Sequence, residues 1–138
     1  PYLGDHIRAN VLGAVCPASG ECCTMIFDGV DTDVFQYYLD FLAEEIPPRD
    51  SKRRLLIVDN ASWHKAQRLH WHHFEVHYLP GYSPDLNPIE RLWLRLKVDF
   101  FSDFIAKSPE QLTQRLSHAL TSLMNDRKTV ASQCAFRK

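Results

Sequence analysis

Hydrophobic and polar positions change their spacing several times along the chain, and each change marks a predicted element. Two short apolar runs, residues 11–16 and 22–27, are separated by residues 17–20 (Pro, Ala, Ser, Gly). The second run is followed by Asp28-Gly29. Short apolar runs bounded by proline and glycine are typical of strands joined by a tight turn. Residues 11–27 therefore predict a β-hairpin.

The next apolar residues recur at intervals of three and four positions, which is helical spacing. They are Val34, Phe35, Tyr38, Leu39, Leu42 and Ile46, and the pattern stops at Pro47-Pro48. Such spacing gathers apolar side chains on one helix face, and a proline disfavours helical backbone in the residue before it. One amphipathic helix is predicted from Asp33 to Ile46.

Two further strands are predicted downstream. Leu55 to Val58 is apolar without interruption, which is typical of a central strand that is buried on both faces. Asp59 ends this strand, and residues 61–70 can form a short helix. Residues 75–79 then alternate between apolar and polar positions, as a strand does.

Two helices with clear start signals complete the chain. The first has Asn87 as its predicted N-cap and Pro88 at its first position. The second follows Ser108-Pro109-Glu110-Gln111, which supplies a cap, a proline and a capping-box partner. The predicted inward faces contain Ile89, Leu92, Trp93, Leu96, Phe100 and Phe104 in the first helix, and Leu112, Leu116, Ala119, Leu120 and Leu123 in the second. The order of elements predicts an α/β fold, a mixed sheet with helices packed on it.

Composition adds limits to this picture. A chain of 138 residues that is 45% hydrophobic fits one domain, residues 1–138, with a real core. No apolar run approaches the roughly 20 residues that cross a bilayer, and the amino end lacks the order of a signal peptide, so a cytoplasmic protein is expected. The net charge of −1 means that any DNA contact must come from local basic patches. The four cysteines form no C-x-x-C pair and are expected to be reduced, mostly buried thiols.

Two acids lie at the ends of predicted elements, Asp59 after a strand and Glu90 in the first turn of a helix. Sites in α/β sheets lie at the carboxyl ends of strands, and hard divalent cations prefer carboxylate oxygens. Two such ions can hold the attacking and leaving oxygens of a phosphodiester. Each acid also has a structural interpretation: Asp59 as the cap of a following helix, and Glu90 as the capping-box partner of Asn87. Spacing alone leaves these alternatives open.

Other polar residues suggest further roles. Lys97 lies two turns after Glu90 on nearly the same helix face, where it could meet a bound phosphate. His64 follows Asp59 closely and suits either an outer-shell or phosphate contact or a plain surface position. Four histidines, His70, His72, His73 and His77, cluster in sequence, but a zinc site is disfavoured because no cysteine lies nearby. Trp93 is expected in the core rather than as a platform for base stacking.

Two segments together carry a resemblance to a known family. They are Asp59-Asn60-Ala61 with His64, and Leu79-Pro80-Gly81-Tyr82-Ser83-Pro84-Asp85-Leu86-Asn87-Pro88-Ile89-Glu90 with Trp93 and Lys97. The chain resembles the DDE transposases of the mariner-like superfamily, in their bacterial insertion-sequence branch. The resemblance is densest between Leu55 and Lys97 and covers most of the chain.

The resemblance implies an RNase H-like fold and an active site of three carboxylates that bind Mg²⁺ or Mn²⁺. Asp59 matches the second carboxylate and Glu90 the third. Water would cleave DNA strands and a DNA 3′-hydroxyl would carry out strand transfer, so the implied partners are transposon ends and target DNA, with the protein on the bacterial nucleoid. Second-shell or DNA-contacting roles are implied for Asn60, His64, Tyr82, Ser83, Arg91 and Lys97.

The chain also departs from the family pattern. Gly81 stands where the family usually has a second proline. The family's first catalytic aspartate lies on a central strand upstream of the hairpin, and Asp5, Asp28 and Asp31 are not convincing replacements. We therefore expect an amino-terminally truncated domain that lacks this strand, carries two of three metal ligands and is inactive alone.

A missing central strand would leave backbone groups of its neighbours unpaired. We expect either a partner chain that fills the gap, as a homodimer or strand-swapped oligomer, or direct closure between the hairpin and residues 55–58. Two other functions remain open: a non-catalytic transposase remnant that acts as a DNA- or protein-interaction module, and an RNase H-like nuclease that cuts without transposing.

Overall fold

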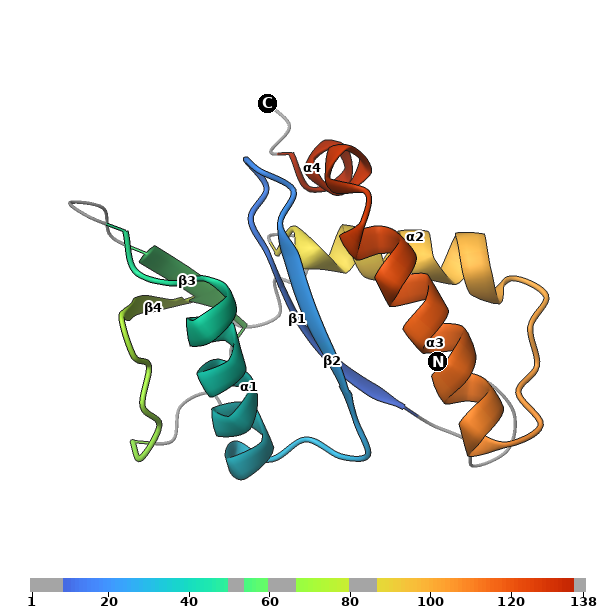
Figure 1. The fold of residues 1–138 in the computed structure, drawn as a ribbon, viewed down its shortest axis with the longest axis horizontal. Coiled ribbons are helices and arrows are strands. Elements are labelled where there is room, and N and C mark those ends of the chain that lie inside the picture. Colours follow the sequence, from blue (N-terminus) through green and yellow to red (C-terminus); the bar gives the residue numbers. More distant parts are fainter. Residues whose placement is uncertain (1–8, 50–53, 60–66, 80–86, 136–138) are drawn as a thin grey trace. The chain divides into compact units, whose positions relative to one another are not determined.

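The structure, a computed structural model, describes residues 9–49, 54–59, 67–79 and 87–135. Its described elements are four strands and four helices, which confirms the α/β class (Figure 1). The chain divides into two compact units. Unit 1 contains Pro1–Gly29 and Pro88–Lys138, and unit 2 contains Val30–Asn87. No helix in the described ranges combines the length and apolar character needed to cross a membrane.

Unit 1 begins with the predicted hairpin. Strands β1 (Asn10–Val15) and β2 (Cys22–Phe27) pair antiparallel, from Asn10 opposite Phe27 to Val15 opposite Cys22. In the turn between them, the Gly20 amide donates to the Cys16 carbonyl at 2.8 Å. Gly20 has φ of +78°, in the left-handed region that glycine adopts without steric cost.

Three helices complete unit 1: α2 (Ile89–Phe101), α3 (Pro109–Met124) and α4 (Arg127–Cys134). The start of α3 is as predicted, because the Ser108 hydroxyl accepts from the Gln111 amide at 3.1 Å. The Gln111 side chain does not complete a capping box with Ser108, since its oxygen accepts from the Lys107 amide at 2.6 Å instead. Helix α4 was not predicted from the sequence.

The start of α2 differs from the prediction of Asn87 as N-cap, which is wrong. The first helical residue is Ile89, and Pro88 occupies the cap position with φ of −56° and ψ of −28° and no side-chain cap bond. The proline ring fixes φ near this value, and the observed ψ makes the backbone helical at Pro88. The Arg91 amide then donates to the Pro88 carbonyl at 3.1 Å.

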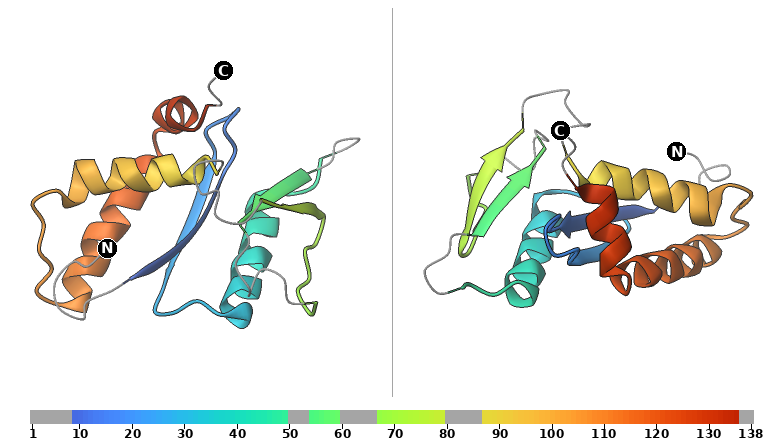
Figure 2. Two further views of the ribbon diagram at one scale, coloured as in Figure 1. Left: turned by 180° about the vertical axis from the view of Figure 1, so that it is seen from behind. Right: turned by 90° about the horizontal axis from the view of Figure 1, so that it is seen from above.

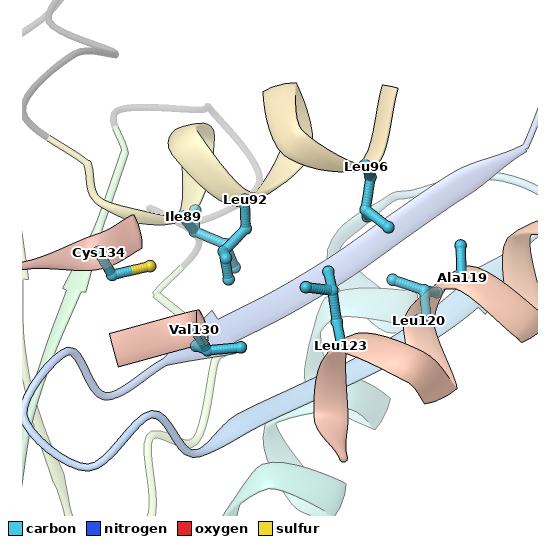
Figure 3. Close-up of a cluster of buried hydrophobic side chains, with 8 residues drawn as sticks. All are labelled: Ile89, Leu92, Leu96, Ala119, Leu120, Leu123, Val130 and Cys134. Atoms are coloured by element: carbon cyan, nitrogen blue, oxygen red, sulfur yellow. The ribbon is translucent and has the colours of Figure 1, made fainter. Parts of the chain in front are cut away.

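The core of unit 1 is built mainly by these three helices. Figure 3 shows its buried side chains, which are Ile89, Leu92 and Leu96 from α2, Ala119, Leu120 and Leu123 from α3, and Val130 and Cys134 from α4. Hairpin residues, among them Val11 and Ile26, pack against this cluster. Burying one leucine contributes about 1.5–3 kcal/mol, so the cluster is the main source of stability of unit 1.

Unit 2 contains α1 (Thr32–Glu45) and the strands β3 (Arg54–Val58) and β4 (Phe74–Tyr78). Asp31 caps α1 by accepting from the Val34 amide at 2.8 Å. The helix buries the predicted apolar face, with Phe35, Tyr38, Leu39 and Leu42 as its buried residues. The two strands pair in parallel, from Arg54 opposite Phe74 to Val58 opposite Tyr78, and Figure 2 shows α1 beside them.

The predicted burial of β3 on both faces is wrong. Leu55 and Ile57 are 57% and 51% exposed, whereas Val58 is only 8% exposed. Successive side chains of a strand point to opposite faces, so one face of β3 is open and the other is covered. The described strands form two two-stranded sheets rather than one mixed sheet. Most of the short helix predicted at 61–70 lies outside the described residues, and positions 67–70 are turn and loop.

Candidate active site

Asp59 lies at the carboxyl end of β3, where its side chain is exposed. The parallel ladder continues to this point, because the Leu79 amide donates to the Val58 carbonyl at 2.8 Å. The residue before Asp59 is therefore held by backbone pairing to the chain that follows β4. The carboxyl end of a parallel strand is where ligand sites of α/β sheets occur.

Glu90 is the second residue of α2 and is half-buried. Its carboxylate makes no hydrogen bond or ion pair with any residue in the described ranges. The capping-box alternative, in which Glu90 would accept from the Asn87 amide, is therefore not formed. The positive end of the helix dipole favours a negative charge at this position.

A close approach between β1 and α2 holds the helix start in place. A Cβ atom added at Gly13 would lie 2.7 Å from Cη2 of Trp93 and 3.0 Å from Cδ1 of Ile89. Gly13 leaves room for the Trp93 and Ile89 side chains, which a larger residue would have to displace. Trp93 is half-buried against the core of unit 1, which agrees with the expected packing role.

The opposite side of the same helix turn is bonded to the end of α4. Nη1 of Arg91 donates to the Ala135 carbonyl at 2.7 Å and to the Gln133 carbonyl at 3.3 Å. The last carbonyls of a helix lack partners within the helix and attract cations. Nearby, the Cys134 thiol donates to the Pro88 carbonyl with a sulfur–oxygen distance of 3.5 Å. Burial raises the pKa of the Cys134 thiol, so the thiol stays protonated and can donate this bond.

The remaining predicted site residues fall into two groups. Lys97 is described, and it lies exposed on α2 two turns after Glu90. Asn60, His64, Tyr82 and Ser83 lie outside the described residues. Their predicted roles therefore stay predictions.

The histidines of unit 2 are engaged in separate contacts. Nε2 of His72 lies 2.7 Å from Oδ1 of Asp40, and Nε2 of His73 lies 2.7 Å from the Ile46 carbonyl oxygen. The hydrogen bond from His72 is the main cause that lowers the pKa of Asp40. No three His, Cys, Asp or Glu side chains within the described ranges are grouped to hold a metal ion. These contacts give no support to a zinc site.

The cysteines are free thiols, as expected, but only Cys134 is buried. Cys16 is exposed, and Cys22 and Cys23 are half-buried. Burial and the neighbouring Cys23 and Cys134 thiols raise the pKa of Cys22 to about 12. A thiol with such a pKa is a poor nucleophile at neutral pH, so we assign Cys22 a packing role.

The donor chemistry of Asp59 and Glu90 fits a hard divalent cation. Carboxylate oxygens are the ligands that Mg²⁺ and Mn²⁺ prefer in proteins. Asp59 belongs to unit 2 and Glu90 to unit 1, and each is placed by its own unit. The Glu90 carboxylate has no hydrogen-bond or ion-pair partner in the part of the chain that the structure describes, so it is open to a metal ion.

Sequence reasoning missed helix α4 and its contact with α2. A local signal for the helix was present, because Asp126 and Thr129 have the spacing of an N-cap and its partner, and the Thr129 amide donates to Asp126 at 3.1 Å. The acceptors of Arg91 are backbone carbonyls, which every residue type carries. No residue pattern could therefore have revealed that contact.

Comparison with known proteins gives the following matches. Residues 3–113 match the family described as DDE superfamily endonuclease. The chain is 28% identical, over 118 residues, to an uncharacterized protein, y4pE/y4sA, of Sinorhizobium fredii (strain NBRC 101917 / NGR234). This similarity covers 85% of the chain and 86% of the relative. No solved structure is significantly similar to the chain.

Proposed function

Because this chain belongs to the DDE superfamily endonucleases, we propose that it is the catalytic domain of a transposase in which Asp59 and Glu90 bind divalent metal ions. The proposal includes cleavage and strand transfer of DNA during movement of an insertion sequence. It also includes an RNase H-like fold, the mariner-like branch of the family, and one catalytic domain formed by residues 1–138. DNA as the substrate follows from the endonuclease family.

The proposal rests mainly on one observation, the lack of a described hydrogen-bond or charge partner for the Glu90 carboxylate. A carboxylate that is not engaged in a cap or an ion pair can bind a cation, and carboxylate oxygens suit a hard divalent ion. Glu90 has no such partner among the described residues, although the start of α2 is held by β1 and α4. A bound cation would supply the missing partner.

Asp59 supports the same proposal from unit 2. Its position directly after β3 is set by the parallel pairing of β3 with β4, so the carboxylate lies at a fixed strand end. The family resemblance assigns the second and third metal-binding carboxylates to Asp59 and Glu90. Divalent ions at such carboxylates stabilise the charge that develops on phosphodiester oxygens during cleavage.

The chain's other polar residues have supporting roles in the proposal. Lys97 neutralises a DNA phosphate near Glu90, as its exposed position on α2 permits. Asn60 and His64 orient the groups around Asp59, and Tyr82 and Ser83 contact DNA or support the turn before Glu90. The protein acts on transposon ends and target DNA in the bacterial cytoplasm, as a homodimer or strand-swapped oligomer.

Nicking of a supercoiled plasmid that carries the element's ends tests the proposal. The full-length product of the gene is incubated with Mg²⁺ or Mn²⁺, alongside its Asp59→Asn and Glu90→Gln variants. Each variant should lose more than about 100-fold of the nicking rate, since even weaker changes around metal ligands cost 10–100-fold. The loss should be greater than any change in DNA affinity.

Two matched acids serve as controls. Asp28 directly follows β2 as Asp59 follows β3, and Glu110 is the second residue of α3 as Glu90 is of α2. Asp28→Asn and Glu110→Gln should retain the nicking rate. Nicking that survives Asp59→Asn or Glu90→Gln would refute the metal assignment, and DNA binding without any metal-dependent nicking would favour the non-catalytic module.

A further inference from the structure

Helix α4 is anchored at both of its ends within unit 1. At its start, Asp126 caps the helix by accepting from the amide and hydroxyl of Thr129, at 3.1 and 2.7 Å. The hairpin turn lies against the same end, since a Cβ added at Gly20 would come within 2.0 Å of the Arg127 carbonyl oxygen. At its other end, α4 is bonded to the first turn of α2 through Arg91 and Cys134. The helix therefore connects the hairpin turn to the helix start that carries Glu90.

These contacts fix the rotation of α2 about its own axis. Ile89 packs against Gly13 of the hairpin, and Leu92 is fully buried in the core, where Figure 3 shows it close to Ile89. Arg91 is bonded to α4. Successive residues of a helix differ by about 100° in direction, so these three directions leave Glu90 nearly opposite Leu92. The orientation of the Glu90 side chain is therefore set by the contacts of the neighbouring residues of α2, and not by a hydrogen bond of Glu90 itself.

We propose that α4 is the positioning element of the Glu90 carboxylate and that Arg91 is the positioning residue through which it acts. The inference rests on the proposed function, because it concerns the same metal ligand. The Arg91 guanidinium bonds the carbonyls of Gln133 and Ala135, so its role is to hold the helix start rather than to contact DNA phosphate. Cys134 assists through its bond to Pro88, the residue before the helix.

Mn²⁺ affinity reports directly on whether the Glu90 carboxylate is oriented to bind a metal ion. Binding of Mn²⁺ to the whole chain is followed by electron paramagnetic resonance, without DNA, for the wild type and for Arg91→Met. The variant should bind about tenfold more weakly, as is typical when a partner that orients a metal ligand is lost. Arg91→Lys keeps a donor and a charge and should recover part of the affinity. Cys134→Ala, which removes the thiol donor, should weaken binding by a smaller factor.

Two control variants separate positioning from general stability. Arg95 is one turn further along α2 and pairs with Asp99 of the same helix at 2.9 Å, so Arg95→Met should leave Mn²⁺ affinity unchanged. Leu112 is 3% exposed and lies in the first turn of α3, at the opposite end of that helix from α4. Leu112→Ala should lower the melting temperature without changing Mn²⁺ affinity. A role of Arg91 in stability alone would instead make Arg91→Met behave like Leu112→Ala, which would overturn the inference.

Failure of the inference and failure of the proposed function give different results. If Glu90→Gln weakens Mn²⁺ binding but Arg91→Met, Arg91→Lys and Cys134→Ala do not, the positioning role is refuted and the metal site stands. If neither the wild type nor Glu90→Gln shows specific Mn²⁺ binding, the proposed function itself is refuted. Should Arg91→Met not fold, Arg91→Lys and Cys134→Ala decide the question by the same comparison.

Discussion

The two candidate metal ligands stand on differently built parts of the molecule. Glu90 belongs to unit 1, where its helix start is packed against Gly13 on one side and bonded to α4 on the other. Asp59 belongs to unit 2, at the end of a two-stranded sheet with one open face that exposes Leu55 and Ile57. The two carboxylates are therefore held by different means, Glu90 by side-chain contacts of its helix and Asp59 by the backbone pairing of its strand.

The largest expected effect tests the difference in packing. Leu92 is fully buried in unit 1, and Leu92→Ala should lower the free energy of unfolding by about 2–5 kcal/mol. Leu55 is 57% exposed on β3, and Leu55→Ala should change stability by no more than about 0.5 kcal/mol. Urea unfolding followed by circular dichroism measures both. Similar losses for the two variants would mean that the open face of β3 is covered in solution.

An effect of similar size is expected at the turn that supports α4. Gly20→Ala places a Cβ within 2.0 Å of the Arg127 carbonyl oxygen at a backbone φ of +78°. Left-handed backbone costs about 1–2 kcal/mol for an alanine, and overpacking adds about 1–3 kcal/mol. A total loss of about 2–5 kcal/mol is therefore expected from the same urea unfolding experiment.

Gly29 provides the control for this substitution, because nothing lies within 4 Å of a Cβ added there. Gly29→Ala should be close to neutral. If both alanine variants were equally stable, the contact between the hairpin turn and α4 would not contribute to unit 1, and the anchoring of α4 at that end would be contradicted.

The smallest effect concerns unit 2, where polar contacts tie α1 to the residues that precede β4. The pKa of Asp40 is lowered mainly by its hydrogen bond with His72. A carboxylate with a lowered pKa stabilises the fold above its unfolded pKa of about 3.9, and this contribution is lost as the pH falls through the folded pKa. Asp40→Asn should therefore be less stable than the wild type at neutral pH, by under about 1 kcal/mol because the pair is largely exposed.

Melting temperatures of the wild type and Asp40→Asn, measured from neutral pH down to strongly acidic pH, check the sign of this effect. The difference between the two should shrink as the pH falls below about 4 and the Asp40 carboxylate takes up a proton. A difference that grew in acid would show that the Asp40–His72 contact does not stabilise unit 2.

The sequence predicts best those features that depend on neighbouring residues. The hairpin turn, the cap at Ser108 and the strand at β4 follow from local patterns, and the structure confirms them. The burial of β3 was not predictable in the same way. It depends on what covers each face of the strand, whereas the apolar run from Leu55 to Val58 records only the side-chain types.

The candidate site shows the same limit. The acids at a strand end and a helix start were visible in the sequence, and Asp59 and Glu90 have these positions in the structure. The sequence assigned the N-cap to Asn87, whereas in the structure Pro88 is in the cap position with φ of −56° and ψ of −28°. The contact of Arg91 with α4 was invisible because its acceptors are main-chain carbonyls of Gln133 and Ala135.

Mn²⁺ binding to Asp59→Asn and Glu90→Gln, measured by electron paramagnetic resonance against the wild type, tests the central claim most directly. Both carboxylates are proposed ligands, so each variant should bind Mn²⁺ at least about tenfold more weakly. Glu110→Gln, the matched acid at the start of α3, should bind as the wild type does. Wild-type affinity in Glu90→Gln or Asp59→Asn would contradict the account.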